Sequence, residues 1–167
     1  MASFIDRVIR AAKLDPNLYE EVEADKTAIG QAMGVVVLSS VAAGIGMIAL
    51  YGVVGVITVT IGALIGWFVW AGLTYLIGTK LLPEPQTRSD LGELLRTIGF
   101  SSSPGLIRIL GIIPALKGIV FFAASIWMLV AMVIAVRQAL DYTSTRRAVL
   151  VCFIGWIIQV LILLLLR

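Results

Sequence analysis

Between residues 27 and 79 the chain carries no charged side chain at all. As one helix this stretch would be about 80 Å long, at a rise of about 1.5 Å per residue. The hydrocarbon core of a bilayer is only about 30 Å thick, so the stretch predicts two membrane crossings joined by a tight turn. Tyr51-Gly52 is the best candidate for that turn, which places the two spans at about 31–51 and 54–78.

Two further uncharged runs, 118–136 and 148–166, lie towards the carboxyl end. A basic residue stands at both ends of each run. Each run has the length of one crossing, which predicts spans at about 118–137 and 147–166.

The segment 97–114 is harder to assign, because it contains Arg108 and has Pro104 near its middle. It is either a fifth span or an interfacial hairpin, and the distribution of charge favours the span. If it crosses, the amino terminus and the polar loops 80–96 and 137–147 share one side. That side then holds ten of the thirteen basic residues, namely Arg7, Arg10, Lys13, Lys26, Lys80, Arg88, Arg96, Arg137, Arg146 and Arg147. The positive-inside rule makes it cytoplasmic, with Arg167 outside the cell membrane.

The amino-terminal region, 1–28, is predicted to be a cytoplasmic amphipathic and acidic segment ahead of a membrane domain at 29–167. From Ser3 to Lys13 the pattern predicts an amphipathic helix, because apolar residues recur on one face and charged residues on the other. Such a helix lies in the headgroup region or packs on the protein's own spans, and the pattern alone leaves both open. An acidic stretch follows, typical of a solvated helix face and also compatible with docking of a basic partner.

Composition agrees with a lipid environment. Hydrophobic residues make up 60% of the chain and charged residues 14%, whereas soluble domains carry about 25% charged residues. The fold class is therefore all-α, an integral membrane bundle of five transmembrane helices with an amino-terminal amphipathic interfacial helix. The basic residues are dispersed between apolar runs, so the net charge of +3 does not indicate nucleic-acid binding.

Catalytic and metal-binding patterns are missing from the sequence. There is no histidine, and Cys152 is the only cysteine, so neither a nucleophile–imidazole pair nor a thiolate metal site is available. Ser101 to Ser103 have no base nearby in sequence, and no acidic residue lies within a predicted span. We therefore expect no enzymatic activity, no cofactor, no metal and no evident small-molecule substrate.

Candidate contacts with lipid or a partner are charged residues of the amino-terminal helix, of the segment 97–114 and of the last polar loop, together with one tyrosine of that loop. They are Arg7, Arg10, Lys13, Arg108, Arg137, Asp141, Tyr142, Arg146 and Arg147. A charge within a span is a functional candidate by default, but Arg108 lies close to Lys117 and we expect it to snorkel to the outer surface. For Arg146 and Arg147, plain orienting charge and a specific headgroup or acidic-partner site both stay open.

Small and aromatic residues mark the expected helix-packing faces. They are Gly30, Gly34, Gly44, Gly62, Gly66, Trp67, Trp70, Trp127 and Trp156. Because the tryptophans lie well inside their spans, a pigment or quinone site among them is the alternative to packing.

Three segments carry a family resemblance: WFVWAGLTYLIGT from Trp67, LLRTIGFSSSPGLIRILGIIP from Leu94 and WMLVAMVIAVRQALDYTSTRRAV from Trp127. They resemble the bacterial branch of the Yip domain family of Ypt/Rab-interacting membrane proteins, and the opening FIDRVIRAAKLDPNLYEEVEAD is similar too. The resemblance implies a five-span bundle with a cytosolic amino terminus. The trafficking role of eukaryotic members does not carry over, because their Asp-Leu-Tyr-Gly-Pro signature is replaced here by Asn17-Leu18-Tyr19-Glu20.

The sequence thus predicts a non-enzymatic scaffold of the inner cell membrane that acts through protein partners, self-association or local bilayer shape. An accessory subunit of a larger membrane complex is one alternative. A small transporter or channel component is the other, and the scarcity of ionisable residues in the spans weakens it.

Overall fold

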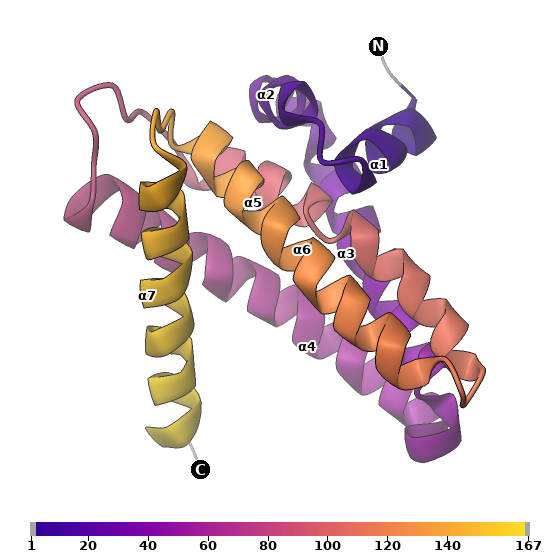
Figure 1. The fold of residues 1–167 in the computed structure, drawn as a ribbon. Helices are drawn as coiled ribbons and strands as arrows, with labels where there is room; N and C mark the ends of the chain where they lie inside the picture. The colour runs from indigo at the N-terminus through magenta and orange to yellow at the C-terminus, as the bar shows by residue number, and fades with distance from the viewer. Residues whose placement is uncertain (1–2, 166–167) are drawn as a thin grey trace.

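A computed structural model describes residues 3–165, all of whose regular elements are helical (Figure 1). In chain order they are α1 (Phe4–Ala12), α2 (Pro16–Ala24), the 3-10 helix η1 (Lys26–Ala28), α3 (Ile29–Gly46), α4 (Ile48–Leu76), the π-helical η2 (Ile77–Leu81), α5 (Leu91–Phe100), the 3-10 helix η3 (Ser103–Ile112), α6 (Lys117–Ala139) and α7 (Thr145–Leu165). The all-α prediction is confirmed for the described residues.

Four helical stretches are long and apolar enough to cross a membrane: Lys26–Gly46, Ile48–Leu81, Lys117–Ala139 and Thr145–Ile162. The protein is therefore a multi-pass membrane protein. The connection between the first two spans runs from Met47 to Gly52: α3 ends at Gly46, one helical turn follows from Ile48, and Gly52 then breaks the helix. Gly52, the predicted turn residue, therefore lies in this connection, with a φ of 62° that is open to glycine at little cost.

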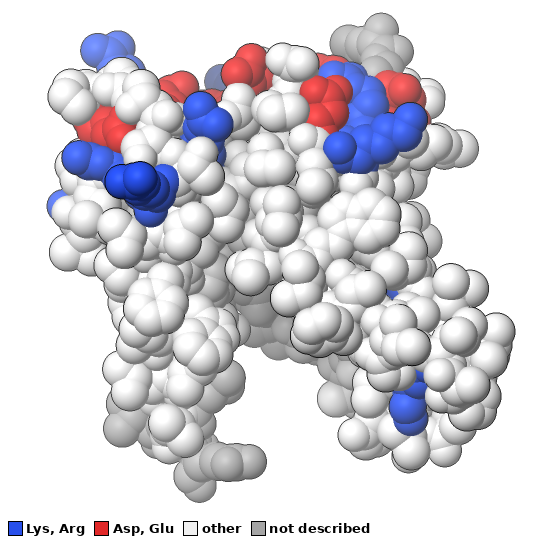
Figure 2. Space-filling view, in the orientation of Figure 1, with Lys and Arg blue, Asp and Glu red and all other residues white. Residues whose placement is uncertain are grey.

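The amino-terminal helices and the two polar loops lie at one end of the bundle, which we call the near end. Figure 2 shows the acidic and most of the basic side chains gathered along this edge. Hydrogen bonds join these segments, among them those from Arg96 Nε to Val22 O at 2.9 Å, from Gln138 Nε2 to Glu20 Oε1 at 2.7 Å, from Gln86 Nε2 to Asp141 O at 3.0 Å, and from Arg147 Nη1 to Pro83 O at 2.8 Å.

The segment 97–114, which was hard to assign from the sequence, belongs to a broken helix. This broken helix consists of α5 followed by η3 and runs beside α3 in the same direction. Three of its glycines follow α3 step by step: Gly99 lies against Ala32, Gly105 against Ser39 and Gly111 against Gly46. From Ala32 to Gly46 α3 advances about 20 Å at about 1.5 Å per residue. The segment thus leaves the near end and reaches the opposite, far end, where α6 begins (Figure 1).

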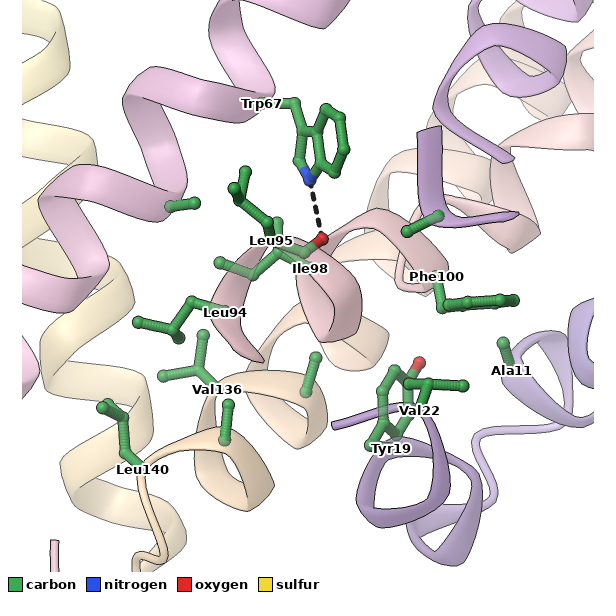
Figure 3. Close-up of a cluster of buried hydrophobic side chains, with 14 of the residues drawn as sticks. Ala11, Tyr19, Val22, Trp67, Leu94, Leu95, Ile98, Phe100, Val136 and Leu140 are labelled. Atoms are coloured by element: carbon green, nitrogen blue, oxygen red, sulfur yellow. Dashed lines mark hydrogen bonds between the residues drawn. The ribbon is translucent and has the colours of Figure 1, made fainter. Parts of the chain in front are cut away.

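The core lies towards the near end and is built around α5, in which every residue from Leu94 to Phe100 is buried. Figure 3 shows side chains from α2, α4 and α6 converging on this helix. From α4, Trp67 donates its indole N–H to the carbonyl oxygen of Leu95 at 2.9 Å. A buried indole thus keeps its hydrogen bond while its ring fills the core.

The last helix, α7, packs on the bundle through one face. Ala148 and Val151 are buried on this face and Ile158 packs against the core, whereas Phe153 and Trp156 are exposed. Towards its carboxyl end α7 parts from the other helices, and Figures 1 and 2 show it as a separate leg below the charged edge.

Small-xxx-small spacing does not locate the close helix contacts. A Cβ added at Gly30, Gly62 or Gly66 would meet no atom within 4 Å, whereas one at Gly44 would lie 2.8 Å from Val56 Cα. A Cβ added at Gly34 would lie 3.8 Å from the ring of Phe4, an ordinary contact. Close approaches occur at Gly46, Gly99, Gly105 and Gly111, where the broken helix meets α3.

Gly46→Ala should lower the melting temperature of the detergent-solubilised protein, because its Cβ would meet the carbonyl oxygen of Arg108, a backbone atom that cannot rotate away. Overpacking of this kind costs about 1–3 kcal/mol. The matched control is Gly62→Ala, whose Cβ enters open space and should leave the melting temperature unchanged or slightly higher. Equal melting of the two variants would contradict the close packing at Gly46.

Candidate functional site

The basic residues of α1 are held by acidic residues that follow it. Arg7 donates from Nε to Glu21 at 2.9 Å, from Nη2 to Asp25 at 2.8 Å and from Nη1 to the amide oxygen of Gln31 at 2.9 Å. Only 3% of Arg7 is exposed, so its guanidinium is engaged inside the protein rather than offered to headgroups. Charge-assisted bonds of this kind also fix the orientation of α1.

Arg10 extends the same network by bonding to Asp15 at 2.8 Å and to Glu21 at 2.6 Å. Lys13, the third predicted contact on α1, is exposed. Asp25 caps the turn after α2, where the Thr27 hydroxyl and then Arg7 lower the pKa of its carboxyl group to about 2. The acidic stretch therefore largely neutralises the chain's own arginines.

With its basic face engaged, α1 leaves apolar side chains uncovered. Ile5 is 69% exposed and Ile9 is 48% exposed, whereas Phe4 and Val8 pack on the core. The carboxyl end of α1 is tied to the middle of α6, because Trp127 donates its indole N–H to the carbonyl oxygen of Ala12 at 2.8 Å. The helix thus lies beside a membrane span, with isoleucines facing outward.

Arg96 attaches this amino-terminal unit to the membrane core. Its guanidinium is buried on α5 and donates to the carbonyl oxygens of Val22 and Glu23, near the carboxyl end of α2. The last carbonyl groups of a helix have no partner within the helix and carry partial negative charge, so an arginine there is favourable.

An acidic cleft of about 920 Å³ opens at the near end between α2, α5 and the loop that follows α6. It brings three of the predicted contacts together with acidic residues of α2 and α5. Its charged and aromatic lining is Glu20, Glu23, Glu93, Arg137, Asp141 and Tyr142. Among the described residues no group of three carboxylates is arranged to hold a metal ion.

Carboxylates outnumber basic residues in the lining of this cleft, and this affects the pKa of Glu23. Burial raises the pKa of Glu23 to about 7, and repulsion from Glu93, Asp141 and Glu20 adds to the shift, while Arg96 opposes it. Arg137 also lines the cleft, where it donates to the carbonyl oxygens of Tyr142 and Thr143. The Tyr142 hydroxyl is also occupied, bonding to the carbonyl oxygens of Gly78 and Leu82.

The start of α7 is held by Glu84, a residue that the sequence did not single out. Its carboxylate accepts bonds from the backbone N–H and the hydroxyl of Thr143, at 3.0 and 2.8 Å, and pairs with Arg147 at 3.3 Å. A carboxylate at a helix amino terminus offsets the unfavourable placement of basic residues there. Arg147 is therefore engaged within the chain, while Arg146 is exposed.

The partly buried side chain of Arg108 points along α6 and away from the far end, to an exposed serine. Its carbonyl oxygen contacts Gly46 at the far end of α3, yet its Nη2 donates to Ser125 at 3.2 Å. Ser125 lies one turn nearer the charged end than Phe121, whose ring lies 5.7 Å from the guanidinium carbon. This orientation differs from the snorkelling that the sequence led us to expect.

The four tryptophans occupy four different settings. Trp67 is buried in the core, Trp127 is bonded to α1, and Trp156 is 59% exposed on the outside of α7. The indole N–H of Trp70 is buried without a hydrogen-bond partner.

Sequence reasoning missed the uncharged polar residues of the spans, Ser39, Ser40, Ser102 and Gln159, which line one internal cavity with Arg108. The signal that would have found them is a polar side chain within an otherwise apolar run, such as Gln159 in the last span.

A comparison with protein families finds a match to the Yip1 domain over residues 19–166, which confirms the family resemblance of the sequence. The match begins within α2 and does not include α1. No curated protein matches the chain, and no solved structure does.

Glu23→Gln should remove a pH-dependent loss of stability. Because the pKa of Glu23 is raised from 4.5 to about 7, the folded protein retains a proton that the unfolded chain has lost, and stability falls as pH rises through this window. We expect the variant to melt above wild type at about pH 8, and the difference to vanish below pH 4.5.

Glu84→Gln is the matched control and should show the opposite dependence. The backbone N–H of Thr143 is the main cause of the lowered pKa of Glu84, so the stability it contributes is present above pH 4.5 and is lost as pH falls. This variant should melt below wild type at neutral pH. Parallel pH profiles of the two variants would contradict the assigned environments.

Proposed function

Since the chain belongs to the Yip1 domain family, we propose that it is a non-enzymatic membrane organiser that shapes the bilayer through its amino-terminal helix. The observation that carries this proposal is the combination of outward isoleucines on α1 with the ion pairs that fix this helix to the bundle. An amphipathic helix inserted in one leaflet occupies area there that the other leaflet does not match.

The attachment of α1 distinguishes it from a free amphipathic peptide. Arg7 joins it to α2 and α3, and Trp127 joins it to α6, so the helix cannot swing away from the spans. A wedge fixed in this way deforms the bilayer next to the protein itself. Because insertion of α1 and of the spans is coupled, the bundle also sets the depth of the helix.

The topology we propose has five crossings, the fifth being the broken helix of α5 and η3. Its support is the parallel course of this segment beside α3, together with the hydrogen bonds that gather the amino terminus and both polar loops at the near end. With ten basic residues there, the positive-inside rule makes the near end cytoplasmic, in the inner membrane. Arg167, predicted to be outside, lies beyond the described residues.

A second candidate function is that of an accessory subunit that binds a basic segment of another membrane protein in the acidic cleft. The crowding of Glu20, Glu23, Glu93 and Asp141 favours it, because an incoming cation would relieve their repulsion. Loss of a co-purifying partner in Glu93→Lys, with bilayer shape unaffected, would favour this function over the first.

Reconstitution tests the organiser function. Full-length protein in vesicles that contain phosphatidylglycerol should produce smaller or tubular vesicles, as seen by cryo-electron microscopy, and the double variant Ile5→Asp, Ile9→Asp should produce vesicles like protein-free ones. The physical reason is that a charged side chain in place of either isoleucine opposes insertion of α1.

The matched control is Ile5→Leu, Ile9→Leu, which keeps the apolar area and should remodel vesicles like wild type. Equal remodelling by the Asp variant would show that α1 is only a packing element.

Single-cysteine labelling in a Cys152→Ala background tests the topology. Ser3→Cys should react with a membrane-impermeant maleimide only from the cytoplasmic side and Lys117→Cys only from the outside. Finding both on one side would remove the fifth crossing, because an even number of crossings would then separate them.

A further inference from the structure

A cavity of about 300 Å³ opens in the membrane-spanning part of the bundle, with polar side chains set among a mostly apolar lining. Helices α3 to α7 and η3 all contribute to its walls. Its polar lining consists of Ser39, Ser40, Trp70, Ser102, Arg108 and Gln159. Polar groups are costly at this depth unless they have partners, so their convergence on one space points to a ligand.

The unsatisfied groups in this cavity are hydrogen-bond donors. Trp70 Nε1 and Arg108 Nε are both buried without a partner, and neither side chain has an acceptor atom. Arg108 brings a positive charge, and no carboxylate is among the lining residues. The chemical complement of such a lining is an anion rich in acceptor oxygens.

An apolar groove of about 610 Å³ adjoins the cavity and shares Trp70 with it. It lies between α6 and α7, where α7 parts from the bundle, and its walls include Val133, Ile134, Phe153 and Trp156. A hydrocarbon chain fits this lining. The cavity and the groove together therefore match one amphiphile with an anionic head and an apolar tail.

We propose that this pair of sites binds one anionic phospholipid, with its phosphate in the cavity near Arg108 and Trp70 and an acyl chain in the groove. A partner helix would fill the groove but would leave Arg108 Nε and Trp70 Nε1 without acceptors. Free phosphate would satisfy those donors but would leave the groove empty. Only the amphiphile accounts for both observations.

Thermal unfolding of the full-length protein in a nonionic detergent tests this site. Phosphatidylglycerol should raise the melting temperature, whereas inorganic phosphate and phosphatidylcholine should have little effect, since they lack the chain and the net negative charge respectively. Binding to the folded state alone produces such a shift. Equal stabilisation by inorganic phosphate would overturn the lipid assignment in favour of a simple anion site, and equal stabilisation by phosphatidylcholine would overturn the role of Arg108.

Variants locate the two parts of the lipid. Arg108→Gln should abolish the shift, and Trp70→Phe, which keeps most of the ring but loses the donor, should reduce it. Val133→Trp should also abolish the shift, because the larger side chain fills the groove. This variant keeps both cavity donors, so it tests the site independently if Arg108→Gln does not fold.

Arg146→Gln is the matched control, because it removes an exposed arginine at the near end. Its lipid shift should equal that of wild type. An unchanged shift in Trp70→Phe or in Val133→Trp would overturn the proposal, as would loss of the shift in Arg146→Gln. The measurement does not involve α1, so its outcome is separate from that of the vesicle experiment.

Discussion

Burial of Arg96 on α5 is the interaction on which the rest of the structure depends. An arginine among buried side chains needs partners for its donors, and here the carbonyl groups near the end of α2 provide them. The same helix contributes its backbone to Trp67 and its side chains to the core. Helices from the polar and the apolar parts of the chain are thus joined at one place.

Part of the charge at the near end is satisfied within the chain, and this limits which surfaces are available to the environment. Arg7 is buried between carboxylates, whereas the side chain of Arg147 pairs with Glu84 and is still 44% exposed. The exposed surfaces are the isoleucines of α1, the acidic cleft and a set of basic residues, namely Lys13, Lys26, Lys80, Arg88 and Arg146. The membrane-shaping proposal rests on the first of these surfaces, and the alternative partner-binding proposal rests on the second.

The broken helix of α5 and η3 packs closely on α3 and contributes to the cavity of the membrane-spanning part. Its glycines bring the backbone against α3, and Ser102 and Arg108 lie in the cavity wall. Irregular backbone at membrane depth is tolerated where it is buried in protein or lines a cavity, and both conditions apply to this segment.

The sequence by itself determined the apolar spans, the all-helical class, the family and which loops are polar. The spans and the polar loops can be predicted because the hydropathy and the length of each segment, compared with the thickness of a bilayer, can be assessed without knowing what the segment packs against. It could not determine that Gly46 and Gly105 make close contacts while Gly62 makes none. The spacing of small residues in the sequence does not tell which helix packs against each of them. The pairing of Glu84 with Arg147 and the hydrogen bond from Arg108 to Ser125 were likewise decided only by tertiary structure. The physical reason is that these side chains bond to groups that lie near them only in the folded protein. Those groups are distant in the sequence.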